Sequence, residues 1–244
     1  VLCARTLDDQ EEVASKIRKY GLVAIPIIDH ENCLVGIVTV DDAMLVMQEE
    51  TTEDISMMAG VSPNEDSYFG TSVFQHAKNR SLWLMLLMLS ATVSGEILAH
   101  YEKAMAAMPV LITFIPMLMG TSGNSGSQSS TMVIRGLAVG EIQFKDFFRV
   151  VFKEIRVALI VGVLLAIVNG VRVYLMYDQD LTLAIAIGIT MIAIVCMAKC
   201  VGCTLPLLAK KIGLDPALMA APLISTIMDT CTILMYFAII TALY

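Results

Sequence analysis

The stretch LTLAIAIGITMIAIVCMAKCVGCTLPLLA, residues 181–209, decides the class of fold, because its only charged side chain is Lys199. A helix of about 20 mostly apolar residues is long enough to cross the roughly 30 Å hydrocarbon core of a bilayer. The whole 244-residue chain has the same bias, since 57% of its residues are hydrophobic and 16% are charged. Soluble domains carry about 25% charged residues. The composition therefore predicts an integral membrane protein.

Four further apolar segments resemble this one, so we expect a mainly α fold with a five-helix transmembrane domain over residues 81–244. Short polar joints separate the segments, which favours antiparallel neighbouring helices. The expected helices cover about residues 81–103, 105–137, 153–177, 181–209 and 216–244.

Charge is distributed unevenly along the chain. Residues 1–80 contain fourteen acidic and six basic residues, whereas residues 81–244 contain nine and ten. The sequence thus predicts an acidic soluble segment followed by a membrane domain. Basic side chains gather in two of the joints, and the positive-inside rule places these joints and the N-terminus in the cytoplasm and the C-terminus outside. These basic residues are Arg135, Lys145, Arg149, Lys153, Arg156, Lys210 and Lys211.

The soluble segment alternates between helical and strand periodicity. Residues 8–22 predict a helix capped by Asp8 or Asp9, and residues 23–40 predict two strands joined by a polar turn. A second helix is expected from Asp41 or Asp42. Such a unit is small for an independent domain. We therefore expect a partial domain over residues 1–46, a connecting helix and linker over residues 47–80, and a longer parent protein.

Asp229 lies near the middle of the fifth expected span. A carboxylate there costs about 2.5–3.5 kcal/mol even on the lenient insertion scale. A structural, hydrogen-bonded aspartate is one explanation. The explanation we favour is a carboxylate that faces a polar pathway and binds a cation or passes a proton, since Ser225 and Thr226 lie one turn away.

The second expected span contains an unusual polar stretch, PMLMGTSGNSGSQSSTMVIRG, residues 116–136. Small residues allow two membrane helices to approach closely, which is one interpretation. Close packing does not require the amides Asn124 and Gln128, however, and these are four residues apart on one helical face. Oxygen-bearing side chains suit a hard, hydrated cation such as Mg²⁺. Both interpretations stay open at this point.

Several further charged residues are weaker candidates for a functional site. Glu96 is either an outer-vestibule carboxylate or a side chain that reaches the interface, and Lys199 is expected to snorkel or to pair with a carboxylate. The connecting helix contains an acidic run that is either a solvated face or a sensor for divalent cations. With Asp41 and Asp42, this run consists of Glu49, Glu50, Glu53 and Asp54. Thr39 and Asp42 form a weak pattern for holding a nucleotide ribose.

Three stretches resemble the MgtE family of magnesium channels and transporters. LVGIVTVDDAMLVMQEETTEDISMMAG resembles the end of a CBS domain with the connecting helix, PMLMGTSGNSGSQSSTMVIRGLAVGEI resembles the second transmembrane helix, and GLDPALMAAPLISTIMDTCTILMYF resembles the fifth. The three stretches occur in the family's order, and the resemblance spans essentially the whole chain.

The resemblance implies a homodimeric magnesium channel in a bacterial inner membrane, with a pore along the dimer axis and gating by cytosolic Mg²⁺ through CBS domains and the connecting helix. Asp229 then matches the pore aspartate and Ser225 a pore-lining position, with Asn124 and Asp215 as further candidate metal residues. ATP is a possible ligand of the CBS domain at Thr39 and Asp42.

Other functions remain open from the sequence. A proton- or sodium-coupled transporter would use Asp229 and Glu96, and a membrane-anchored Mg²⁺ sensor would show no flux. We expect no enzyme, because the spans contain no Ser–His, HExxH or paired-Asp arrangement. Lipid and divalent cations are expected partners, and nucleic acid is not.

Overall fold

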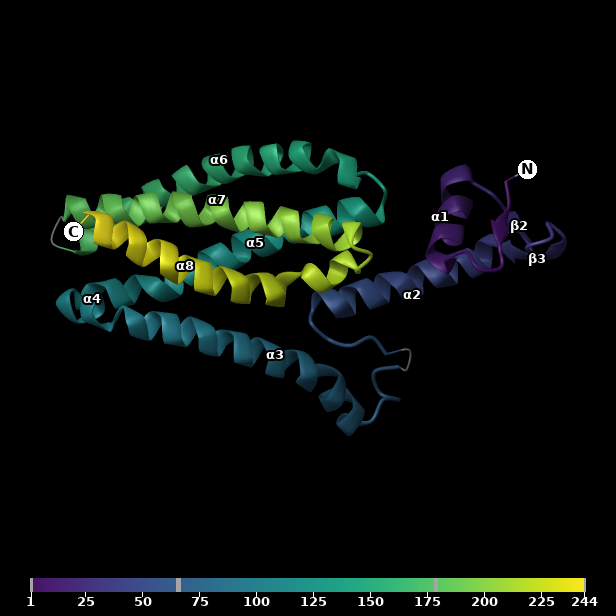
Figure 1. The fold of residues 1–244 in the computed structure, drawn as a ribbon, viewed down its shortest axis with the longest axis horizontal. Helices are drawn as coiled ribbons and strands as arrows, with labels where there is room; N and C mark the ends of the chain where they lie inside the picture. The colour runs from purple at the N-terminus through teal and green to yellow at the C-terminus, as the bar shows by residue number, and fades with distance from the viewer. Residues whose placement is uncertain (1, 65–66, 178–179, 244) are drawn as a thin grey trace. The chain divides into compact units, whose positions relative to one another are not determined.

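The computed structural model describes residues 2–64, 67–177 and 180–243. The chain forms two compact units. One contains the described residues up to Ser56 together with Pro63–Thr71, and the other contains Met57–Ser62 and the described residues from Ser72 onward. Helices make up most of the second unit, and the first contains helices and strands (Figure 1). The expected mainly α fold, with a small α/β unit in front of a bundle of long helices, is confirmed.

The N-terminal unit has a three-stranded sheet in the order β1-β2-β3. β1 pairs with β2 in parallel, and β2 pairs with β3 in antiparallel fashion. The predicted order of helix, strand, strand and helix is confirmed, whereas the two-residue strand β1 was not predicted. The elements are β1 (Ala4–Arg5), α1 (Gln10–Tyr20), β2 (Ala24–Ile28), β3 (Leu34–Thr39) and α2 (Val40–Met58).

Local chemistry explains where α1 begins and ends. The Asp9 side chain accepts a hydrogen bond from the Glu11 amide at 2.9 Å, which satisfies a free donor of the first turn. Gly21 ends the helix in the left-handed conformation that glycine adopts without a steric cost. Val13 and Ile17 then face Ile25 of β2 in a small apolar core. This helix packs as its sequence pattern predicted.

Among its described residues, the C-terminal unit contains five helices of 23 residues or more, joined by short connections. α7 lies between α6 and α8, and α3 runs along α8 (Figure 1). Val133, Cys203 and Leu207 form part of the core where α5, α6 and α7 meet near one end of the unit. The elements are α3 (Val73–His100), α4 (Glu102–Ala107), η1 (Pro109–Phe114), α5 (Ile115–Ala138), η2 (Phe144–Asp146), α6 (Phe147–Met176), α7 (Leu181–Lys211), η3 (Pro216–Met219) and α8 (Ala221–Leu243).

The observed helices differ from the expected ranges in several places. α6 begins at Phe147 rather than at residue 153, and α8 begins at Ala221, after η3, rather than at residue 216. α3 begins at Val73 rather than at residue 81, because the Ser72 side chain caps it by accepting from the Gln75 amide. The expected second helix over residues 105–137 is divided into α4, η1 and α5. Met108 is extended before Pro109, as residues before proline tend to be, and a 3₁₀ turn follows. Residue 244 and residues 65–66 lie outside the described residues.

Three of the described helices are long and apolar enough to cross a membrane, namely α3, α7 and the segment Pro216–Leu243 that contains α8. α5 and α6 have 24 and 30 residues and are long enough, but α5 carries the polar stretch and α6 carries four charged residues in its first ten positions. That all five helices cross the membrane therefore stays a prediction.

α3 differs from the other spans in its packing. Only 6% of its most apolar window is buried within the chain, compared with 56% for α7. Its leucines and methionines, such as Leu84 and Met88, are exposed. An apolar face of this size needs lipid or another protein surface to cover it.

Candidate ion pathway

The glycines of the polar stretch bring α5 into close contact with its neighbours. A Cβ atom added at Gly202 of α7 would collide with the carbonyl oxygen of Gly126, so the two backbones touch. A Cβ atom at Gly123 would lie 3.2 Å from the Ser225 hydroxyl of α8. Close helix packing is thus one real role of this stretch.

Buried hydroxyl groups on α5 tie the helix to the chain around α8. Thr232 Oγ1 donates a 2.6 Å hydrogen bond to Ser122 Oγ. Ser130 Oγ donates a 2.6 Å bond to the carbonyl oxygen of Met219, at the end of η3. In an apolar environment such bonds satisfy groups that would otherwise be unpaired. The small polar residues therefore hold α5 against α8 at Ser122 and against the end of η3 at Ser130.

The two amides of the stretch have a different environment from these serines. Asn124 and Gln128 are exposed within the single chain, whereas Ser122, Ser125, Ser129 and Ser130 are buried. Asn124 directly follows Gly123, the residue that touches Ser225 of α8. The structure thus separates the polar stretch into a buried packing face and an open amide face.

Asp229 is half-buried on α8, one helical turn after Ser225 and three residues before Thr232. Both of these neighbours contact α5, through Gly123 and Ser122 respectively. No described residue forms a hydrogen bond or an ion pair with the Asp229 carboxylate. The structural explanation, an aspartate held by neighbouring helices, therefore has no support among the described contacts.

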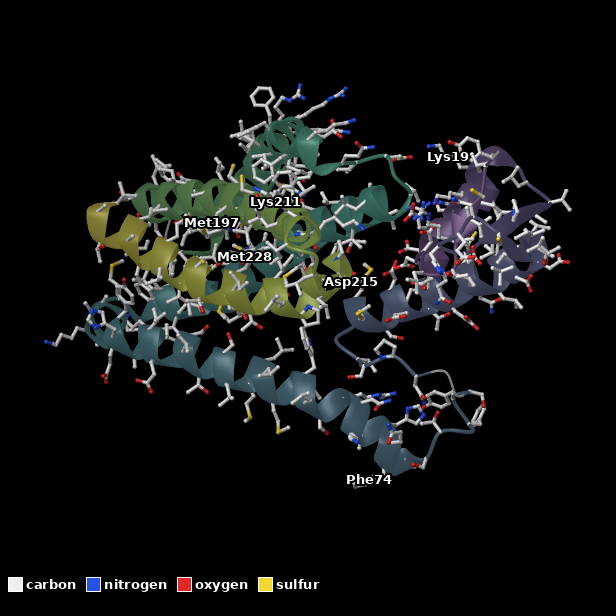
Figure 2. All side chains as sticks on the ribbon, turned by 45° about the vertical axis from the view of Figure 1, so that its right-hand side comes forward. Lys19, Phe74, Met197, Lys211, Asp215 and Met228 are labelled. Atoms are coloured by element: carbon white, nitrogen blue, oxygen red, sulfur yellow. The ribbon has the colours of Figure 1, made fainter. Side chains whose placement is uncertain are left out.

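The next residue along α8 contacts α3. Thr230 Oγ1 and Ser94 Oγ share a 2.6 Å hydrogen bond, and Ser94 is the buried residue of an otherwise exposed helix. On the other side of α8, Met228 packs with Met197 of α7 (Figure 2). Asp229 is consequently flanked in sequence by residues that pack, and it alone of the three is charged.

Lys199 does not snorkel. Its side chain is only 4% exposed, and its Nζ donates to Ser129 Oγ at 3.3 Å. Ser129 Oγ in turn donates to Glu154 Oε2 of α6 at 2.5 Å. The expected pairing with a carboxylate thus occurs through a serine. Sequence reasoning missed Glu154, although it is the only acidic residue among Arg149, Lys153 and Arg156 at the start of α6.

Asp215 lies in the connection between α7 and α8 (Figure 2). Its Oδ1 accepts a 2.7 Å hydrogen bond from the Ala217 amide and so caps η3. This capping accounts for one of its oxygens. Glu96 is exposed on α3.

The acidic run of α2 lies in the N-terminal unit. Glu49, Glu50 and Glu53 line a groove of about 700 Å³ with Gln10 and Asn64, and Gln10 donates to Glu50 at 3.1 Å. Asp41 and Asp42 lie in the first turn of the same helix, where their negative charges interact favourably with the positive end of the helix dipole. Asp54 is half-buried further along the helix. Within the described ranges, no three acidic, histidine or cysteine side chains converge on one metal position.

Thr39 and Asp42 form a capping box at the start of α2. The Thr39 hydroxyl donates to Asp42 Oδ2 at 2.6 Å, and the Thr39 amide donates to the same oxygen at 3.0 Å. These two bonds hold the pKa of Asp42 below its ordinary value of 3.8, with the hydroxyl contributing most. Thr39 and Asp42 therefore have a structural role as the cap of α2, independent of any nucleotide binding.

The long apolar helices indicate an integral membrane protein, and the Asp229 carboxylate on α8 has no partner among the described residues. Comparison with known families makes this specific. Residues 115–239 match the MgtE family model, described as a divalent cation transporter, and residues 1–49 match the CBS domain. The chain therefore belongs to the MgtE family.

Curated relatives agree with this assignment. The chain is 37% identical over 239 residues to the magnesium transporter MgtE of Thermus thermophilus, covering 98% of this chain and 53% of the relative. It is 35% identical over 242 residues to that of Bacillus subtilis, covering 99% and 53%, and 33% identical to that of Enterococcus faecalis, covering 98% and 52%. The chain thus spans about half the length of the curated relatives it matches.

Proposed function

We propose that this chain forms the conducting part of a passive Mg²⁺ influx channel and that Asp229 attracts the ion. The observation that carries the proposal is the half-buried Asp229 carboxylate without a described partner on the apolar helix α8. Such a group costs free energy in a membrane unless a cation or water compensates it. The relatives named magnesium transporters support Mg²⁺ as that cation.

The surroundings of Asp229 suit a hydrated ion. Mg²⁺ prefers oxygen ligands and keeps several of its waters, so side chains that accept or donate through water are sufficient. Ser225 lies one turn before Asp229, and Asn124 lies on the open face of α5, next to the Gly123–Ser225 contact. We assign these two residues to the wall of the path.

Passive entry needs no further energy source. A membrane potential contributes about 2.3 kcal/mol per charge per 100 mV, which is about 4.6 kcal/mol for a divalent ion that moves toward a negative interior. We therefore propose no catalytic step.

We propose further that the N-terminus lies in the cytoplasm and the C-terminus outside a bacterial inner membrane.

A homodimer would complete the path. The amide face of α5 is open, and most of α3 is exposed, so one chain leaves both the polar and the apolar surfaces uncovered. In a two-fold assembly a residue that lies near the axis faces the same residue of the other protomer. Two Asp229 carboxylates would then face one ion.

Gating through α2 is the remaining part of the proposal. Met57 and Met58 at the end of α2 pack against Ile134 of α5 and against Ala217 and Ala220 beside η3. A displacement of these methionines would reach the start of α8. The acidic groove of Glu49, Glu50 and Glu53 is the candidate for sensing cytosolic Mg²⁺ by charge compensation. ATP binding at Thr39 and Asp42 stays a prediction for the whole protein.

The test is Mg²⁺ uptake into liposomes that contain the natural protein, with a membrane potential alone, a pH gradient alone or a Na⁺ gradient alone. Passive conduction predicts uptake that follows the potential and ignores the other two gradients. Uptake driven by protons or Na⁺ would support the coupled transporter instead, and no uptake under any condition would leave a membrane-anchored sensor.

A further inference from the structure

A buried polar chain links three helices of the C-terminal unit. Lys199 of α7 donates to Ser129 of α5 at 3.3 Å, and Ser129 donates to Glu154 of α6 at 2.5 Å. Lys199 and Ser129 are both buried, with 4% and 1% of their surfaces exposed. A single hydroxyl group on α5 thus lies between two side chains of opposite charge.

Each of the two charges offsets the free-energy cost of burying the other. A buried ion pair whose partner is removed leaves an uncompensated charge in a low-dielectric environment, whereas removal of both charges avoids this penalty. Because Ser129 bonds to both side chains, the network ties α5 to α6 and to α7 at this residue. The network therefore acts on α5 rather than only between α6 and α7.

The helices have little freedom at this point. Ser129 is one turn from Gly126, and Lys199 is about one turn from Gly202, the two glycines whose backbones touch. The next serine, Ser130, donates to the Met219 carbonyl, just before α8. Consecutive side chains of α5 are thus anchored on one side to α6 and α7 and on the other side to the start of α8.

The network lies about one turn along α5 from the part that contacts α8 beside Asp229, since a Cβ atom added at Gly126 would lie 3.6 Å from Met228. Ser129, Glu154 and Lys199 are about 10–18 Å along their helices from the ends at Ala138, Phe147 and Lys211, at 1.5 Å per residue. By the same rise, Asp229 is about 12 Å from the start of α8 at Ala221. Packing of Val133 with Cys203 and Leu207, and of partly buried Phe147 against them, shows that the ends of α5, α6 and α7 meet.

We propose that Lys199 and Glu154 are positioning residues for ion conduction, which act through Ser129 to fix the rotation of α5 and thereby the place of Asn124 relative to Asp229. This inference rests on the proposed function. Ser129 follows Asn124 by five residues on one continuous helix, so a rotation at Ser129 moves the amide as well.

The test compares Mg²⁺ and Ca²⁺ flux in liposomes for the natural protein and for four variants, namely K199M, K199R, E154Q and the double variant K199M/E154Q. The ratio of the two fluxes is the decisive quantity, because a smaller folded fraction lowers both fluxes equally. We expect K199M and E154Q each to change the ratio by about threefold or more, and K199R and the double variant to stay within about twofold of the natural protein.

Two results would overturn the proposal. One is an unchanged flux ratio in conducting K199M and E154Q. The other is a double variant whose change equals the product of the single changes, since independent effects exclude a link through Ser129. If the natural protein itself carries no Mg²⁺, the proposed function fails and the positioning role fails with it, which is a distinguishable outcome. If one single variant does not fold, the other keeps the test decisive, because its own flux ratio either changes as expected or overturns the proposal.

Discussion

Ser122 of α5 and Thr232 of α8 share a buried 2.6 Å hydrogen bond, three residues along α8 from Asp229. This bond and the contact of Gly123 with Ser225 hold the two helices together on either side of the aspartate in sequence. The carboxylate is thus placed by bonds in which it takes no part, which leaves it available for an ion.

The Ser122–Thr232 bond can be tested by removing one partner at a time. Ser122→Ala leaves the Thr232 hydroxyl buried without its acceptor, which costs about 1–3 kcal/mol. Changing both residues, with Thr232→Val added, removes the unpaired group, so thermal unfolding in detergent should show the double variant to be less destabilised than the sum of the single variants. Additive losses would mean that the two hydroxyls are not coupled.

The contact between Gly202 and Gly126 predicts that a larger side chain at Gly202 will destabilise the protein. Gly202→Ala places a methyl group against the Gly126 carbonyl, and because that atom belongs to a helix backbone we expect a loss of about 1–3 kcal/mol in unfolding free energy. Gly120→Ala on α5 is the matched control, since its methyl group meets open space and alanine favours the helix. The midpoint of thermal unfolding should fall for the first variant and hold or rise for the second. Equal midpoints would contradict the close α5–α7 crossing.

The capping box predicts a pH effect in the N-terminal unit. Because the folded pKa of Asp42 lies below its ordinary value of 3.8, the contribution of this pair to stability is present above that pH and is lost as the pH falls through the folded pKa. Thr39→Val removes the largest cause and should move the pKa of Asp42 upward. A carboxyl-detected NMR titration of the natural protein and the variant measures this. The same pKa in both proteins would show that the hydroxyl bond does not form.

Apolar runs were sufficient to predict the long helices, because a membrane requires that length and composition. Boundaries were less predictable. α3 extends into the polar residues after Ser72 because a cap and helical hydrogen bonds, rather than hydropathy, decide where a helix begins. The break before Pro109 has a visible signal, the proline itself, which the apolar pattern of residues 105–137 obscured.

The candidate site was predictable to a similar degree. An aspartate in an apolar helix is visible in the sequence as a candidate. The glycines and serines around Asn124 predicted a close helix contact, which the structure shows, and an ion path, which stays a prediction. The link from Lys199 to Glu154 was not predictable as such, because it depends on which faces of α5, α6 and α7 meet. The assignments of Asp229, Ser225, Asn124 and Asp215 to the metal path, and of the acidic run to regulation, stay predictions.

The most direct test of the account is Mg²⁺ flux into liposomes that contain the natural protein with Asp229→Asn, at a fixed membrane potential. The change removes the charge and keeps the size of the side chain, and Glu96→Gln is the matched control because this exposed carboxylate lies on α3. We predict that Asp229→Asn lowers the flux at least about tenfold, the effect of about 1.4 kcal/mol, while Glu96→Gln leaves it unchanged. Natural flux in folded Asp229→Asn protein would contradict the assignment of Asp229 to the ion path.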